Sequence, residues 1–143
     1  MKRILFLLIL ITFFASAVTA QQNEKVESLK AATDNIFELS KNKDYKNAAD
    51  KIAYYGKDAE RLFKDHYNYA DEKDAAQVKR ICKKIKALID ISDSHTFGEI
   101  TSETKDGIAT SKVEVIFSSG EQELITNFLF IEISARLLLF DID

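Results

Sequence analysis

Residues 108–142 read IATSKVEVIFSSGEQELITNFLFIEISARLLLFDI, and this stretch decides the fold class. Apolar and polar residues alternate over residues 108–117, which is the period of a β-strand with one buried face. Residues 124–133 are apolar on both faces, so we expect a central strand that is covered on both sides. A last strand is predicted over residues 136–142. Two short turns separate these strands: Ser118-Ser119-Gly120 and Ser134-Ala135.

The residues just upstream add one more strand to the predicted sheet. Phe97–Glu103 contains β-forming residues, and the Asp106-Gly107 pair that follows is typical of a hairpin turn. The segment Ser92–His95 lies between this strand and the residues before it, and we expect it to be a connecting loop.

Before residue 93 apolar residues recur about every 3.6 positions, rather than at every second position as in the strands, and this spacing predicts helices. Residues 23–40 and 71–90 each carry an apolar stripe opposite a polar face. Between them Asp44 is a plausible N-cap of a second helix, and Gly56 is placed to end it. A third helix is predicted from Asp58, with one face formed by Ala59, Leu62, Phe63 and either His66 or Tyr67.

Helices first and hairpin-linked strands second predict an α+β fold. In this fold N-terminal helices pack on a curved C-terminal antiparallel sheet. Because no repeat or linker interrupts the pattern, residues 21–143 are expected to form a single α+β domain.

Residues 1–20 have the three-part pattern of a secretory signal peptide. Two basic residues precede the apolar run Ile4–Phe14, and small residues follow it. As a helix this run would span only about half of a hydrocarbon core, so we expect cleavage after Ala17 or Ala20 rather than a permanent anchor. No cysteine near these positions could carry a lipid. The predicted destination is the periplasm or the outside of a bacterial cell.

The composition excludes several classes of protein. The chain of 143 residues is 46% hydrophobic and 30% charged, with no Pro, one Cys and two His. Collagen-like, disulfide-framework and long disordered chains are therefore excluded, as are zinc sites with four Cys or two Cys and two His. Loss of residues 1–20 removes two basic residues and no acidic one, so the net charge changes from −3 to −5. This acidity argues against a general nucleic-acid-binding protein.

Three stretches resemble a group of known proteins: KDYKNAADKIAYYGKDAERLFKD from Lys43, VKRICKKIKALID from Val78, and FLFIEISARLLLFDID from Phe128. They are similar to small exported proteins of unknown function from Gram-negative bacteria. The order of helices and strands resembles the nuclear-transport-factor-2-like, or cystatin-like, cone. This resemblance implies a cone-shaped α+β fold, and it implies no activity.

The lone cysteine, Cys82, lies in the apolar stripe of the helix predicted over residues 71–90. Free cysteines are among the most buried residues, so we expect an inert thiol that packs against the sheet. The alternative is a reactive thiol, for which Lys79 and Lys86 would supply nearby positive charge.

Asp65 and His66, with Tyr67 and Tyr69 nearby, are the candidates for acid–base chemistry, since cone-fold isomerases and cyclases use such groups inside their cavity. Neighbouring residues on a helix point about 100° apart, however, so Asp65 and His66 are not expected to face one pocket together. Neither Asp65-His66 nor Asp93 with His95 has a third ligand at a regular spacing, so no metal site is predicted.

A basic run, Lys79, Arg80, Lys83, Lys84 and Lys86, favours either an acidic partner or, more simply, the solvated face of an amphipathic helix. The chain's negative charge and the lack of interleaved aromatic residues favour the second interpretation. Five tyrosines in the helical part either ring the helix–sheet interface or line a ligand cavity. Three residues are the candidates for the rim of such a pocket: Tyr45, Tyr55 and His66.

We therefore expect an exported, non-enzymatic binding or protein-interaction module. Its partner would be a small apolar ligand or an envelope protein, and no cofactor is predicted. Any ligand is expected between the helices and the concave face of the sheet. The alternatives are a small cone-fold enzyme that acts on an apolar ligand, similar to an isomerase or cyclase, and a structural component of the envelope. A deep pocket with at least two convergent polar groups would favour the enzyme.

Overall fold

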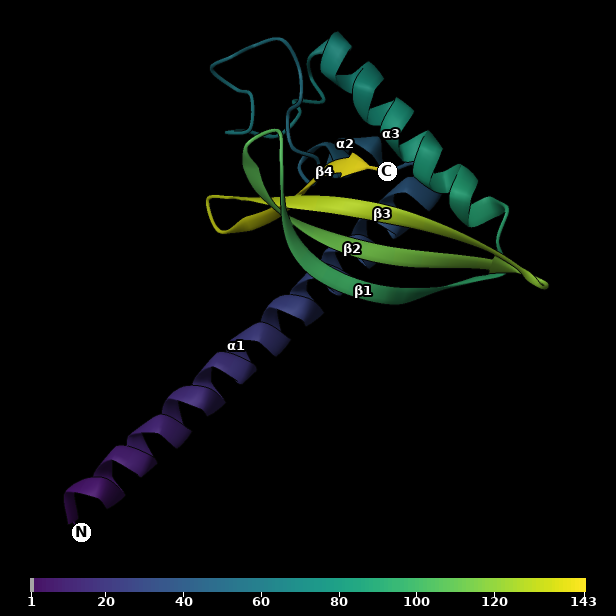
Figure 1. Cartoon of the computed structure of the whole chain (residues 1–143). Helices are drawn as coiled ribbons and strands as arrows, with labels where there is room; N and C mark the ends of the chain where they lie inside the picture. The colour runs from purple at the N-terminus through teal and green to yellow at the C-terminus, as the bar shows by residue number, and fades with distance from the viewer. Residues whose placement is uncertain (1) are drawn as a thin grey trace.

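The computed structural model describes the backbone of residues 2–143 and the side chains of residues 21–143. The elements follow in the order helices, then strands (Figure 1): α1 Lys2–Lys41, α2 Tyr45–Ala49, α3 Glu72–Asp90, β1 Ser94–Lys105, β2 Ile108–Ser119, β3 Gln122–Ile133 and β4 Arg136–Ile142. The strands form one antiparallel sheet in the order β1-β2-β3-β4. The prediction of an α+β fold with helices on a curved antiparallel sheet is confirmed.

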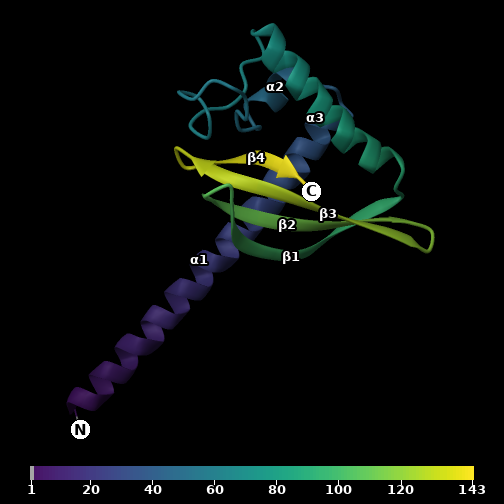
Figure 2. The same ribbon diagram turned by 45° about the horizontal axis from the view of Figure 1, so that its top comes forward.

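One face of the sheet carries the main core. Alternate residues of β2 and the residues Phe128 and Phe130 of β3 point to this face and are buried. Helices α1 and α3 pack against each other and cover the face (Figure 2). The helix residues at the centre of the contact share exposed fractions of 0–3%: Leu29, Ile36 and Phe37 from α1, and Val78, Cys82 and Ile85 from α3. The predicted apolar stripes of both long helices are confirmed.

The opposite face of β3 carries a second, smaller core. Leu129 and Ile131 pack there with residues of β4 and with Ala53. The far end of the β1–β2 hairpin bends toward β4 (Figure 1), so that Ile108 contacts the same cluster. The prediction that β3 is covered on both faces is therefore confirmed for residues 128–131. It is wrong at the start of the strand, where Leu124 and Ile125 remain 44% and 56% exposed, because the β2–β3 hairpin runs past the residues that cover the sheet.

The strands end at two-residue turns. Asp106 and Gly107 both have positive φ, and so do Ser134 and Ala135, which is the backbone of a tight hairpin turn that matches the twist of the sheet. The predicted turns at Asp106-Gly107 and Ser134-Ala135 are confirmed. The middle turn lies one residue later than predicted, because Ser119 still pairs with Gln122 and the chain reverses at Gly120.

The prediction of a third helix from Asp58 is wrong. Residues 50–71 form a loop of irregular turns that we call the α2–α3 loop. Its two ends pair with each other, since Tyr54 donates its N–H to the Asp65 carbonyl at 2.8 Å and Tyr67 donates to the Ile52 carbonyl at 3.2 Å. These bonds fold the segment back on itself, and Phe63 takes a positive φ that no continuing helix allows.

Helix α2 begins as predicted, with the Asp44 side chain accepting the N–H of Asn47. It ends at Ala49, earlier than predicted, and Gly56 does not end it. The chain leaves the helix because residues 51–53 extend along the outer edge of β4. There Ala53 donates to the Leu139 carbonyl, and Leu139 donates to the Lys51 carbonyl, both at 2.8 Å. Backbone pairing with a distant strand thus overrides local helix propensity.

His95 was expected in a connecting loop, and this prediction is also wrong. The residue lies inside β1 and pairs with Phe117 of β2. Its ring packs edge-on against Phe37 at 5.1 Å, and its Nε2 lies 3.4 Å from an oxygen of Asp34. The sheet therefore begins at Ser94, before the first strongly β-forming residue. His95 lies in the strand because Phe37 of α1 packs against its ring.

The predicted signal peptide falls on residues 1–20, whose side chains lie outside the described residues, and it stays a prediction. Among the residues whose side chains the structure describes, no helix combines the length and the apolar character needed to cross a membrane.

Candidate functional site

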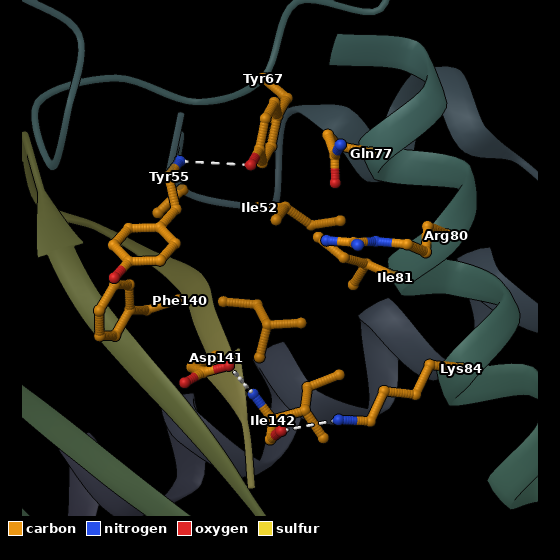
Figure 3. Close-up of a pocket in the computed structure, with 12 residues that line it drawn as sticks. Ile52, Tyr55, Tyr67, Gln77, Arg80, Ile81, Lys84, Phe140, Asp141 and Ile142 are labelled. Atoms are coloured by element: carbon orange, nitrogen blue, oxygen red, sulfur yellow. Dashed lines mark hydrogen bonds between the residues drawn. The ribbon is translucent and has the colours of Figure 1, made fainter. Parts of the chain in front are cut away.

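A pocket of about 390 Å³ lies between α3 and the edge strand β4 (Figure 3). Its volume is within the usual range for small-molecule sites, about 300–1,000 Å³. The main core leaves little space over the middle of the sheet, since its side chains pack there without large exposed areas. The pocket therefore sits at the edge of the sheet, where α3 diverges from β4 and the start of the α2–α3 loop closes one end.

The floor of the pocket is apolar. Ile52 and Ala53 come from the extended segment beside β4, Ile81 comes from α3, and Leu139 and Phe140 come from β4 itself. Segment and strand are joined at the Ala53 and Leu139 backbone bonds, so the floor is a continuous surface. Such a surface favours apolar groups of a ligand.

The polar groups of the lining come from opposite sides. Helix α3 contributes Gln77, Arg80 and Lys84, which follow one another along one face of the helix at spacings of three and four residues. Figure 3 shows the Arg80 side chain extending from α3 toward the middle of the pocket. Lys84 donates from Nζ to the Ile142 carbonyl at 2.8 Å, which ties α3 to the end of β4.

Two tyrosines of the α2–α3 loop, Tyr55 and Tyr67, line the end of the pocket that this loop closes. The hydroxyl of Tyr67 accepts the backbone N–H of Tyr55 at 3.3 Å (Figure 3). Burial raises the pKa of Tyr67, so its phenol is neutral at ordinary pH. The Tyr55 ring is 54% exposed and packs edge-on against Phe140, with ring centroids 5.4 Å apart. Tyr55 therefore forms an accessible aromatic rim.

Asp141 is the acidic residue of the lining, and Lys105 neutralises it. The Lys105 Nζ atom lies 2.7 Å from Asp141 Oδ2 and 2.8 Å from Asp143 Oδ2. Burial alone would raise the pKa of Asp141, but the hydrogen bonds from Lys105 and from the Ile142 N–H outweigh it, and the pKa is lowered. Asp141 is thus an ionised carboxylate that already has its cation.

The loop that carries both tyrosines is held by an ion pair between buried Asp74 and half-buried Arg61. Asp74, only 5% exposed, accepts from Arg61 Nη2 and from the Asn68 N–H, each at 2.8 Å. The Arg61 guanidinium lies 4.0 Å from the centre of the Tyr54 ring and also donates to the His66 carbonyl at 2.9 Å. These contacts fix the α2–α3 loop against α3 and so set the position of the pocket wall.

Of the three residues predicted at the rim of a pocket, the structure places one in the lining. Tyr55 lines the pocket. Tyr45 is half-buried against the main core, and neither Tyr45 nor His66 belongs to the lining. The sequence pattern does not point to Gln77 or Asp141, and Tyr67 is a candidate only among the five tyrosines that could line a cavity. Arg80 and Lys84 are predicted on a solvated helix face, and both are exposed while also lining the pocket. Their position beside Ile81 at the border of the apolar stripe was the signal that could have identified them.

Asp65 and His66 contact each other, and neither lines the pocket. The argument that they diverge assumed a helix, and the α2–α3 loop is not helical. Nδ1 of His66 lies 3.0 Å from Asp65 Oδ1 and 3.3 Å from Arg136 Nη2, while Nε2 lies 3.3 Å from Asp50 Oδ1. This cluster joins the end of α2, the loop and the β3–β4 turn. None of its residues belongs to the pocket lining.

Cys82 is 0% exposed in the main core, so the prediction of a buried thiol is confirmed. Burial raises its pKa, which keeps the thiol protonated and unreactive. Among the described side chains, no group of three or more His, Cys, Asp or Glu residues is arranged to hold a metal ion.

Comparisons of the chain with protein-family models, with curated proteins and with solved structures gave no match.

Proposed function

We propose that this chain is an exported binding module, and that its site is the pocket between α3 and β4. The observation that carries the proposal is the combination of a continuous apolar floor with a few polar groups from three separate segments. This is the usual construction of a small-molecule site, in which apolar surface gives affinity and fixed polar groups give orientation. The export part of the proposal rests on the sequence pattern of residues 1–20.

The state of the polar groups favours binding over catalysis. Asp141 is ionised and engaged by Lys105, and the Tyr67 phenol is neutral and accepts a backbone N–H. A general base works best with a pKa near the working pH, whereas the pKa of Asp141 is lowered and the Tyr67 phenol keeps its proton, so both are weak bases. The chemistry of the lining therefore supports retention of a ligand.

We also propose that the fold is a variant of the cystatin-like cone, as the order of elements suggests. The support is the meander of four strands that curves on a pair of packed helices. A bulge in β1 and another between β3 and β4 provide the curvature, since bulges bend and twist the strands that contain them.

The experiment uses an uncharged apolar dye, N-phenyl-naphthylamine, whose fluorescence rises when it leaves water. We expect enhancement with the purified protein and loss of most of it in Gln77→Trp, which places a large ring over the pocket from α3. Lys83→Trp adds the same ring at an exposed position of α3 outside the lining and should leave the signal unchanged. No enhancement with the unmodified protein, or equal loss in both variants, would contradict the proposal.

A further inference from the structure

The charged side chains that line the pocket differ in whether they already have a partner within the protein. Asp141 forms an ion pair with Lys105, and Lys84 donates a hydrogen bond to the Ile142 carbonyl. Arg80 makes no hydrogen bond or ion pair with any side chain or backbone group that the structure describes, although its guanidinium lies over the apolar floor (Figure 3). The pocket therefore presents an unmatched positive charge beside apolar surface.

An unmatched guanidinium selects a particular partner. Its planar fork of N–H donors fits a carboxylate or phosphate with two parallel hydrogen bonds, and such charge-assisted bonds are the stronger kind. Arg80 is exposed, but the apolar lining beside it excludes part of the water around a bound anion, so the contact gains more there than in open solution. The apolar floor would at the same time accept a hydrocarbon or aromatic body.

The backbone edge beside the pocket argues against an extended peptide as the occupant. A peptide would add to β4 through the outward N–H and C=O groups of that strand. At Leu139 those groups already pair with Lys51 and Ala53. At Ile142 the N–H donates to Asp141 Oδ1 and the C=O accepts from Lys84, both at 2.8 Å. The edge is occupied at both positions, which leaves side-chain recognition of a small molecule.

We propose that the pocket binds a small amphiphile with one anionic group, a carboxylate or a phosphate, and an apolar acyl or aromatic body. Arg80 holds the anion, Lys84 adds positive charge one turn further along α3, and Phe140 with Ile52 and Ile81 contacts the apolar body. This inference rests on the proposed function, because it assigns the ligand class of the same pocket. The ligand enters as a free molecule, since the volume of about 390 Å³ suits one small molecule.

The test compares decanoate with decan-1-ol, which share a chain and differ in the charge of the head, by titration calorimetry near neutral pH. We expect decanoate to bind at least about tenfold more tightly. In Arg80→Gln this preference should fall to within about threefold, while the affinity for decan-1-ol stays the same. Lys83→Gln removes the same charge from an exposed position of α3 outside the lining and should keep the preference.

Several outcomes would overturn the inference, and they separate it from the proposed function. Equal affinity for the two probes, together with dye binding that Gln77→Trp blocks, overturns the anion selectivity and leaves the apolar site standing. Equal loss in Arg80→Gln and Lys83→Gln shows a general charge effect and overturns the role of Arg80. Vesicles of phosphatidylglycerol serve as the membrane arm: binding to them that depends on Arg80, without binding of decanoate, assigns the charge to a membrane surface instead.

Discussion

Helix α3 and the α2–α3 loop are neighbours in the chain, and both have apolar residues at helical spacing, yet only α3 is a helix. In α3 the centre of the stripe is buried in the main core against α1, and Asp71 caps the first turn by accepting the Asp74 N–H. In the loop the same spacing is overridden by backbone pairing of Ile52 with Leu139 and Tyr67. Periodicity thus predicts structure where the periodic face is buried as a unit, and fails where distant strands compete for the backbone.

The two regions also differ in where their stability resides. The stability of α3 comes from a row of buried apolar side chains, each of which the sequence identifies. The loop has buried residues of its own, such as Ile52, Tyr54 and Tyr67, but its attachment to the start of α3 depends on the polar contacts of Asp74 with Arg61 and Asn68. Four substitutions test this difference, and they follow in order of expected effect.

Cys82→Lys should have the largest effect, because it places an unpaired ammonium at the centre of the α3 stripe. We expect a loss of about 4 kcal/mol or more in the free energy of unfolding, measured by urea denaturation. Cys82→Ala should lose on the order of 1 kcal/mol, through a small cavity. A folded Cys82→Lys protein with nearly unchanged stability would show that α3 does not depend on its buried stripe.

Asp74→Ala should lose about 3 kcal/mol, since it leaves the Arg61 guanidinium and the Asn68 N–H without their buried partner. The change should be local first: limited proteolysis should cut within residues 55–68 under conditions that leave the unmodified protein intact. Asp90→Ala removes an exposed carboxylate from the same helix and is the matched control. Equal effects of the two substitutions would refute the role of the buried pair.

Gly56→Ala should lose about 1–2 kcal/mol, because a Cβ at this position would overlap the ring of Tyr54. The Tyr54 ring cannot easily move, since it is buried between Arg61 and Tyr67. Gly56 is therefore needed for close packing within the loop and not as a helix end. Lys57→Ala, at the exposed neighbouring position, should change stability by less than about 0.5 kcal/mol. A neutral Gly56→Ala would mean that the loop packs less tightly than described.

Lys86→Ala should have the smallest effect. Lys86 and Asp90 lie four residues apart on α3 and form an ion pair at 2.6 Å. Because both side chains are partly exposed, the pair should contribute only about 0.3–0.5 kcal/mol, and less in high salt. Denaturation at low and high salt measures this. A loss comparable to that of Asp74→Ala would erase the contrast between the two regions.

The sequence was sufficient for the elements whose evidence is local. The alternation in β2, the capped start of α3 and the Asp106-Gly107 turn all follow from neighbouring residues. It was insufficient for the pocket, because that site depends on where Leu139 meets residues 51–53 and on how the loop returns to α3. Arg80 illustrates the limit: it is exposed, as the helix pattern predicts, but only the placement of β4 shows that it lines a pocket.

The pairing of residues 51–53 with β4 also has a kinetic consequence. The floor of the pocket and the end of α2 are completed only when Leu139 is present, long after α1 and α2 have been synthesised. Closing so long a loop is entropically costly and slows folding relative to a purely helical chain. A nascent chain that still lacks β4 therefore cannot form this floor. The pocket is therefore among the last parts of the molecule that can form as the chain is synthesised.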